Sequence, residues 1–400
     1  MIRKRMLAAV MICMLLCMMP CRRNRAEALS DEEKLSIRVA LYTYFPNPES
    51  FQDIVQSAWE QEHPDVDLCF VPWNCYVTEL PEDLDVFVFD SLYLDSYLNE
   101  DALLPIPKES IPNYEDLFPY AAEACTVDSE LYAIPQFLCT YLLYSREGDA
   151  EMAEVDTIAE LYRVFGGETQ SSRQRSWNER VLFDEQDDIS KICLYLQAVI
   201  DCEGYYRDSF SPLEEDSLSQ KAIEALNMLV WLTDGAQEDP IMETADAGCS
   251  AALFGKGEGR AYIGFSEAMT YMGDAVSTVR FCPLALGGSE DVCVLYADLV
   301  GVSSRVADRK KDLAIELAAL ITGTDVMKAV LLPTQSFPYT QYFLSARESV
   351  YDALAESAPA FSKLKAIMSA PGNRLFRISP DGADYLKQAM PTVGLLPFSN

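Results

Sequence analysis

The sequence predicts an α/β protein with two lobes. Its 400 residues exceed what one hydrophobic core usually supports, so two domains of ordinary size are expected. Half of the residues are hydrophobic and 24% are charged, a balance typical of a well-buried globular protein rather than a disordered one. Apolar runs of strand length alternate with segments of helical period, which indicates parallel βαβ units.

The first elements form one α/β block. A strand is expected at 35–44, a helix at 51–63, strands at 66–73 and 84–90, and a helix at 91–104 that ends before a proline. Two extended segments, at 131–138 and 141–146, then follow each other closely. They indicate the point at which the chain crosses from one lobe to the next.

The rest of the chain is expected to build the second lobe and then return to the first. Gly235 closes the third of the new helices, and the polar stretch 166–180 is expected to be a surface loop. The remaining helices are predicted at 157–166, 189–202, 220–235, 312–331, 345–368 and 383–390. The remaining strands are predicted at 260–265, 279–286 and 294–302.

This order of elements resembles that of bilobed extracellular solute-binding proteins, a periplasmic-binding-protein-like fold of type II. The ligand cleft of such a fold lies between the lobes, where strand ends and helix N-termini meet. We expect 31–138 and 292–340 to form lobe 1, and 139–291 and 341–400 to form lobe 2.

Residues 1–30 have the pattern of a signal peptide, with the basic start MIRKR followed by a short apolar run. We therefore expect a secreted or extracytoplasmic protein without stable membrane insertion, and Cys21 is a candidate lipid anchor. The net charge of −32 disfavours nucleic acid and anionic membranes as partners. We expect a monomer.

Twelve cysteines and one histidine bound the possible chemistry. Three of the cysteines lie in the export segment, and the nine that remain leave at least one thiol unpaired. With His63 the only histidine, a zinc site is improbable, so neither a metal nor a cofactor is expected. The usual motifs of nucleotide-binding proteins, zinc proteases and α/β-hydrolases are missing.

Cys139 is the candidate nucleophile, and Glu267 is its candidate base. A cysteine in an apolar strand is usually inert packing, but Cys139 lies at the predicted crossing between the lobes. A glutamate at a helix start is usually a solvated cap, but Glu267 directly follows the apolar run AYIGF. In a partly apolar cleft its pKa would rise toward neutrality, which suits a general base.

Aromatic and acidic side chains gather at the carboxyl ends of the predicted parallel strands. Each is ordinary by itself, but together they suit a planar heterocycle that carries amino donors. Their positions are Tyr42, Tyr44, Asp90, Tyr296 and Asp298.

With these residues in place, the sequence resembles the bacterial thiaminase I family. The resemblance runs from about residue 35 to the C-terminus and is clearest in VALYTYFPNPESFQ, DLDVFVFDSLYL, YAIPQFLCTYLLYSR, GRAYIGFSEAMTYMGD and NRLFRISP. It implies that Cys139 is the nucleophile and Glu267 its base, and that the aromatic and acidic set lines a pyrimidine pocket. Phe265 stands where relatives are expected to carry tyrosine, and Gly248 where another pocket aromatic is expected.

The resemblance implies the substrates and the reaction. Thiamine would react with an organic nucleophile, which is an amine, a pyridine or a thiol. The Cys139 thiolate would add to C6 of the pyrimidine ring, the thiazole would depart, and the nucleophile would replace it at the methylene carbon. Covalent catalysis of this kind divides one difficult displacement into two easier steps.

Three alternatives remain open at this point. A solute-binding protein that captures thiamine for a transporter would have the same fold and export signal, but it would need neither Cys139 nor Glu267. A hydrolase could use the same pair with water as the acceptor. A catalytically inactive relative is the third alternative, because of Phe265 and Gly248.

Overall fold

The computed structural model describes residues 34–167, 179–183, 188–204, 218–233, 249–287, 293–378 and 382–397. The predicted signal peptide with Cys21, and also Gly235 and Gly248, lie outside these ranges. The chain separates into two units, residues 1–35 and 36–400, and the sheets and helices below belong to the second unit apart from the first residue of β1.

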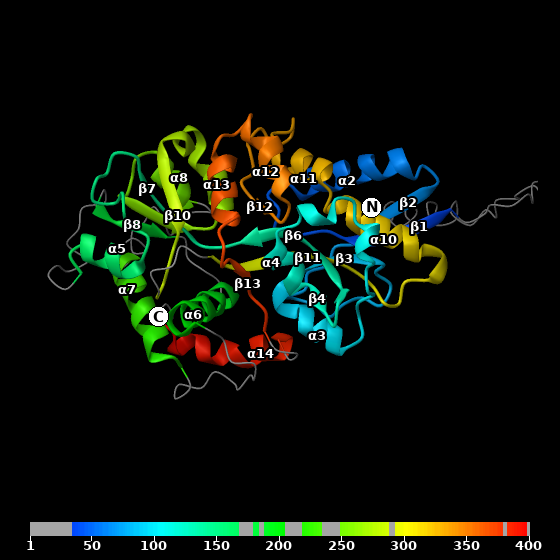
Figure 1. Ribbon diagram of the computed structural model, residues 1–400, viewed down its shortest axis with the longest axis horizontal. Coiled ribbons are helices and arrows are strands. Elements are labelled where there is room, and N and C mark those ends of the chain that lie inside the picture. Colours follow the sequence, from blue (N-terminus) through cyan, green and yellow to red (C-terminus); the bar gives the residue numbers. More distant parts are fainter. Residues whose placement is uncertain are drawn as a thin grey trace, which may run out of the picture. The chain divides into compact units, whose positions relative to one another are not determined.

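A seven-stranded sheet and a four-stranded sheet form the framework (Figure 1). The larger sheet has the order β12-β6-β11-β3-β1-β2, with β13 paired to β11. Its strands are β1 (Leu35–Ala40), β2 (Val66–Phe70), β3 (Val86–Asp90), β6 (Ala133–Cys139), β11 (Val294–Val302), β12 (Leu344–Ser345) and β13 (Arg374–Leu375). The smaller sheet has the order β10-β7-β9-β8, built from β7 (Leu142–Arg146), β8 (Val181–Phe183), β9 (Ala261–Gly264) and β10 (Val279–Pro283). A two-stranded hairpin, β4 (Thr126–Val127) and β5 (Glu130–Leu131), is separate from both.

Helices cover these sheets. α10 packs on β11, β3 and β6 of the larger sheet, and α2 packs on α10 and α11. α8 packs on β8 and β9 of the smaller sheet, while α6 contacts both α7 and β11. The helices in the first half of the chain are α2 (Pro48–Glu62), α3 (Leu94–Asn99), α4 (Pro119–Ala124), α5 (Ile158–Val164) and α6 (Asp188–Glu203). Those in the second half are α7 (Gln220–Thr233), α8 (Cys249–Gly255), α9 (Met269–Met272), α10 (Lys311–Ile321), α11 (Thr324–Leu331), α12 (Glu348–Ala355), α13 (Ala360–Met368) and α14 (Gly382–Ala389).

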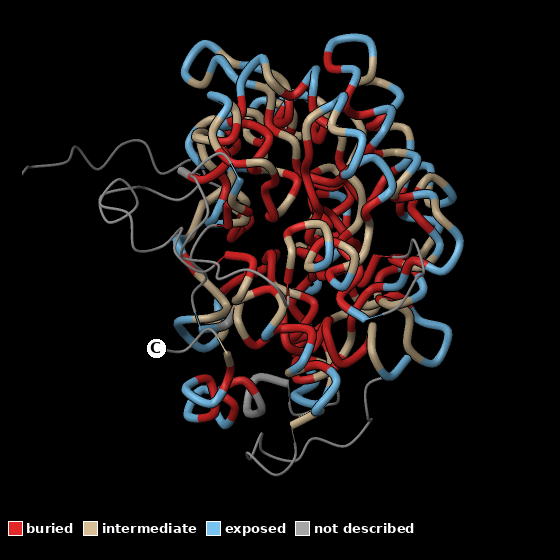
Figure 2. The backbone as a smooth tube through the Cα atoms, turned by 90° about the vertical axis from the view of Figure 1, so that its left-hand side faces the viewer, coloured by how far each residue is buried: buried red, intermediate tan, exposed pale blue. Residues whose placement is uncertain are grey.

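Buried residues fill the interior, and exposed residues lie mainly on the outer turns of the chain (Figure 2). All nine residues of β11 are buried, because this strand runs inside the sheet between β6 and β3. Near-continuous apolar runs such as VLYADLVGV are typical of strands that are covered on both faces. The only acidic residue of that run, Asp298, therefore lies in the core.

Two long helices predicted from the sequence are each divided in two. The predicted helix 312–331 breaks at Gly323, which forms the N-cap of α11, and 345–368 breaks at Pro359, which precedes α13. A glycine at a helix boundary and a proline at a helix start are both common. Hydrophobic periodicity alone did not reveal these breaks, because both halves bury the same kind of apolar face.

The strand assignments differ from the sequence analysis in two ways. We expected the aromatic and acidic residues at carboxyl ends of parallel strands. This is wrong for the residues of β11, because β11 runs antiparallel to β3 and β6. β12 and β13 pair with β6 and β11 of the larger sheet, whereas residues 341–400 were expected in the second lobe. The lobe limits themselves stay a prediction.

No helix within the described ranges is long and apolar enough to cross a membrane.

Candidate active site

Cys139 is the last residue of β6, at the point where the chain passes from the larger sheet to the smaller one. Only Thr140 and Tyr141 separate it from β7, which begins at Leu142 in the other sheet. On the other side, Cys139 is paired in register with Tyr296 of β11. The thiol is therefore held on a rigid strand at the junction of the two sheets.

The smaller sheet brings Glu267 to the same junction. β9 ends at Gly264, which is paired with Leu142, and Glu267 follows three residues later in a short 3-10 helix. A Cβ atom at Gly264 would lie only 2.1 Å from the Tyr262 hydroxyl, so glycine leaves room for that side chain at the end of β9. The pairing of β7 with β9 thus brings together two residues that are far apart in the sequence.

The charge of Glu267 acts on the Cys139 thiol. Burial raises the pKa of the Cys139 thiol well above its usual value, and the next largest cause is the charge of Glu267, followed by those of Asp298 and Asp90. The free protein therefore keeps this thiol protonated. A thiolate can form only when its proton is taken and a positive charge offsets the carboxylates around it.

Glu267 has the features of a proton acceptor. Burial raises its pKa to about 7, so the carboxyl group is near half-ionised at neutral pH. Its Oε2 atom is buried and has no hydrogen-bond partner. An unpaired buried carboxylate oxygen is costly, and such groups are concentrated at functional sites.

Two aspartates face each other on neighbouring strands of the larger sheet. Asp90, the last residue of β3, is in register with Asp298 of β11. Asp90 accepts hydrogen bonds from the Tyr76 hydroxyl and, at 2.7 Å, from the Leu92 backbone N–H. Burial nevertheless raises the pKa of Asp90 to about 6.

Asp298 is the more deeply placed of the pair, with 5% of its surface exposed. Burial raises its pKa well above the usual value, and the charges of Asp90 and Glu267 raise it further. Its Oδ2 atom has no hydrogen-bond partner. Two carboxyl groups this close do not ionise together readily, so the pair can present one proton donor and one carboxylate acceptor.

Aromatic rings surround this pair. Tyr42 lies with its ring centre 5.9 Å from Tyr44, and the ring of Tyr44 lies 6.1 Å from that of Tyr76. The charges that raise the pKa of Tyr42, after burial itself, are those of Asp298, Cys139, Glu267 and Asp90. Tyr42 therefore lies between the two halves of the site.

The remaining predicted residues have structural contacts that fix them near the thiol. The Tyr296 hydroxyl donates to the Cys193 carbonyl at 2.5 Å. Phe265 stacks on Tyr141 with ring centres 4.3 Å apart, and its carbonyl accepts a hydrogen bond from Tyr144. The Phe265 ring, which lacks a hydroxyl group, is thus fixed by packing against Tyr141.

A small pocket lies beside the paired aspartates. It includes four predicted residues, and the lining is Leu41, Tyr42, Thr43, Tyr44, Trp73, Asn74, Cys75, Tyr76, Val88, Phe89, Asp90 and Asp298. Cys139, Glu267, Phe265 and Tyr296 are not part of this lining. They belong to the site through strand pairing and, for Cys139 and Glu267, through charge.

Sequence reasoning missed three residues of the site: Cys75, Tyr76 and Tyr141. Tyr76 follows the second strand as Tyr42 and Tyr44 follow the first, so inspecting every strand end would have found it. Tyr141 was hidden in the run that connects the two sheets, where an aromatic residue looks like ordinary core. Cys75 is partly buried and resembles the other unpaired cysteines.

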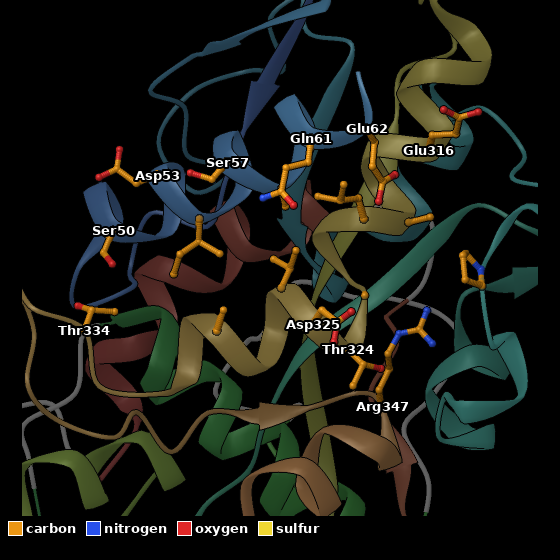
Figure 3. Close-up of a pocket in the computed structure, with 18 of the residues that line it drawn as sticks. Ser50, Asp53, Ser57, Gln61, Glu62, Glu316, Thr324, Asp325, Thr334 and Arg347 are labelled. Atoms are coloured by element: carbon orange, nitrogen blue, oxygen red, sulfur yellow. The ribbon is translucent and has the colours of Figure 1, made fainter. Parts of the chain in front are cut away.

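A second cavity, of about 1120 Å³, lies between α2, α10 and α11 (Figure 3). Its labelled side chains include Asp53, Glu62, Glu316 and Asp325, and none of the predicted site residues lines it. His63 packs beside Trp59 and pairs with Glu316 at 3.0 Å. The His63 side chain therefore interacts with Glu316 of α10 and is not a partner of Cys139.

Among the residues that the structure describes, Cys69, Cys75, Cys125, Cys139 and Cys202 are free thiols, and no group of three or more His, Cys, Asp or Glu is placed to hold a metal ion.

Comparison with known proteins identifies the class of fold. Maltose-bound MalE3 of T. maritima superimposes with a TM-score of 0.60 at 17% identity, over 90% of this chain and 99% of that one. At this identity the likeness concerns the fold alone. The chain has the α/β fold of periplasmic solute-binding proteins, as the order of its elements predicts.

Closer relatives identify the family. Thiaminase-1 of Paenibacillus thiaminolyticus is 36% identical over 366 residues, which cover 91% of this chain and 88% of the relative. The structure of Clostridium botulinum thiaminase I in complex with thiamin superimposes with a TM-score of 0.84 at 37% identity, over 90% of this chain and 99% of that one. The Thiaminase-1 domain model matches residues 140–287. The chain belongs to the thiaminase I family, and by this membership it is a thiamine-degrading transferase.

Proposed function

We propose that Cys139 and Glu267 transfer the pyrimidinylmethyl group of thiamine from its thiazole to an organic base. The observation that carries this proposal is the meeting of the two residues at the sheet junction, where the charge of Glu267 acts on the Cys139 thiol. A protein that only captured its ligand would need neither a nucleophile nor a base.

The first half-reaction begins with proton transfer from the Cys139 sulfur to Glu267. The sulfur then bonds to C6 of the pyrimidine. The C5–C6 double-bond electrons move to form an exocyclic double bond to the methylene carbon. The bond from that carbon to the thiazolium nitrogen breaks, and the nitrogen keeps the electron pair. Neutral thiazole departs, and the pyrimidine stays on Cys139.

The second half-reaction reverses this electron flow with a different partner. The nucleophile bonds to the methylene carbon, and the ring electrons return to C5–C6 and expel the sulfur. Glu267 gives its proton back to Cys139, and the carboxylate then passes the proton of the incoming amine to solvent. One thiamine and one neutral amine thus yield a thiazole, a substituted pyrimidine and one proton.

The thiazolium cation of thiamine explains how a protonated thiol becomes reactive. Three carboxyl groups and burial hold the Cys139 pKa high in the free protein. A thiazolium charge beside them offsets this field and favours the thiolate. The nucleophile is therefore generated mainly when a cationic substrate is present.

Asp90 and Asp298 are suited to recognise the aminopyrimidine. An amino group and a neighbouring ring nitrogen present one donor and one acceptor. A carboxylate and a protonated carboxyl group present the complementary pair. The deeper burial of Asp298 assigns it the proton, and Asp90 then accepts from the amino group.

The test is a transfer assay with the purified chain, thiamine and aniline. We expect free thiazole and the pyrimidinylmethyl derivative of aniline, and we expect Cys139→Ser to lower the rate at least about 10⁴-fold. Cys69→Ser, which changes a thiol on β2, is the matched control and should keep the activity. Thiamine recovered unchanged would instead favour a solute-binding protein, and cleavage without aniline would favour a hydrolase.

A further inference from the structure

We propose that Tyr44 forms an exchange platform at the mouth of the site. Its ring would hold the departing thiazole first and an incoming aromatic base second. The ligand class is a planar aromatic amine or pyridine, neutral or cationic. This inference rests on the proposed function and concerns where the second substrate binds, whereas the sequence analysis placed Tyr44 in the pyrimidine pocket.

The exposure of the pocket residues shows which end faces solvent. Asp298, at the inner end, is 5% exposed, Tyr42 and Asp90 are partly buried, and Tyr44 is 55% exposed. All four line the same pocket. A molecule that leaves or enters the pocket on this side therefore passes Tyr44.

Tyr44 is held in place although it is exposed. Its hydroxyl accepts a hydrogen bond from the Asn74 side-chain amide at 2.9 Å, and the Asn74 side-chain oxygen accepts the Tyr76 backbone N–H at 2.9 Å. The rings of Tyr42 and Tyr76 lie against it at 5.9 Å and 6.1 Å. A fixed ring with a solvent-facing side is a preorganised surface for another aromatic ring.

The reaction geometry places both exchanged groups on this side. If Asp90 and Asp298 hold the pyrimidine at the inner end, the methylene carbon points toward the mouth. The thiazole leaves from that carbon, and the nucleophile arrives at the same carbon after the thiazole has gone. One platform can therefore serve both rings in turn. The nearby carboxylates disfavour an anionic nucleophile by charge repulsion.

The experiment compares two acceptors with two variants. With Tyr44→Ala, we expect kcat/KM for aniline to fall about fivefold, the range expected for loss of a ring contact, and that for 2-mercaptoethanol to fall less than twofold. The inhibition constant of 4-amino-5-hydroxymethyl-2-methylpyrimidine should not change, because this ligand lacks a second ring. Tyr44→Phe keeps the ring but loses the Asn74 bond, so its loss with aniline should be smaller.

The matched control is Tyr339→Ala, which removes another tyrosine with 55% exposure that does not line the pocket. Equal losses for the two acceptors, or a pyrimidine inhibition constant that rises as much as the aniline value falls, would overturn the exchange platform. Failure of the proposed function would look different, because the wild-type chain would then transfer the pyrimidine to neither acceptor.

Discussion

Two buried carboxylates of the site, one from each sheet, differ in their hydrogen-bond partners. Asp90, from the larger sheet, accepts bonds from Tyr76 and from the Leu92 N–H. Glu267, from the smaller sheet, keeps one buried oxygen without any partner. Burial raises the pKa of both, to about 6 for Asp90 and about 7 for Glu267.

This difference separates holding a ligand from moving a proton. A carboxylate fixed by donors keeps one orientation, which suits recognition. A carboxylate that keeps one oxygen without a donor, with a pKa near neutrality, can gain and lose a proton at little cost. In the proposed mechanism, the larger sheet therefore supplies the binding residues and the nucleophile, and the smaller sheet supplies the base.

Among the substitutions that test this difference, Glu267→Gln should have the largest effect on the rate. Without a proton acceptor, kcat should fall about 10³-fold, within the range of general-base catalysis. In the wild type, the rate should rise with pH as Glu267 ionises near pH 7, because the carboxylate is the active form. The variant should lose this rise. The measurement is the pH dependence of aniline transfer between pH 5 and pH 9.

Glu356→Gln is the control, since Glu356 is an exposed residue at the end of α12. A rise near pH 7 that persisted unchanged in Glu267→Gln would show that another group takes the proton.

Asp90→Asn should have a smaller effect and a different kinetic signature. The amide cannot accept from the substrate amino group as strongly as the carboxylate, so KM for thiamine should rise about 30-fold. The same substitution should weaken inhibition by the free pyrimidine by a similar factor. Asp53→Asn, in the cavity of Figure 3, should change neither value. If only kcat fell, Asp90 would be part of the proton transfer instead.

The smallest effect concerns stability. Glu267 has a raised folded-state pKa, so its neutral form stabilises the fold below its ordinary unfolded value, and this contribution is lost as pH rises through about 7. Glu267→Gln removes the cost of the buried charge. The free energy of unfolding of the variant should therefore exceed that of the wild type by about 3 kcal/mol at pH 8, and should match it at pH 4.

Urea denaturation at the two pH values measures this difference. An equal stability at pH 8 would mean that Glu267 is solvated in the folded protein and lacks the environment of a base.

The sequence was informative about the strands and about the two central residues. Apolar runs at 84–90, 131–146 and 294–302 predicted strands, and family motifs pointed to Cys139 and Glu267. The sequence could not provide the register that sets Asp90 opposite Asp298, because register depends on pairing between distant segments. The parallel direction that we expected for β11 was wrong for the same reason.

Tyr76 shows a second limit. Its place after the second strand could have marked it as a candidate, but its role depends on a hydroxyl group that reaches Asp90 from a neighbouring loop, and the sequence does not indicate that contact. The raised pKa of Glu267 was predicted, because burial after an apolar strand has a direct electrostatic consequence. The environment of a side chain could be inferred where it follows from adjacent residues in the sequence. It could not be inferred where it follows from packing between distant segments.

The most direct test of the covalent account is the mass of the protein after incubation with thiamine and no acceptor. The account predicts a pyrimidinylmethyl adduct on the peptide that contains Cys139, lost when aniline is added and not formed in Cys139→Ser. An unmodified Cys139 during active turnover, or an adduct on Cys75 or Cys193 instead, would contradict it.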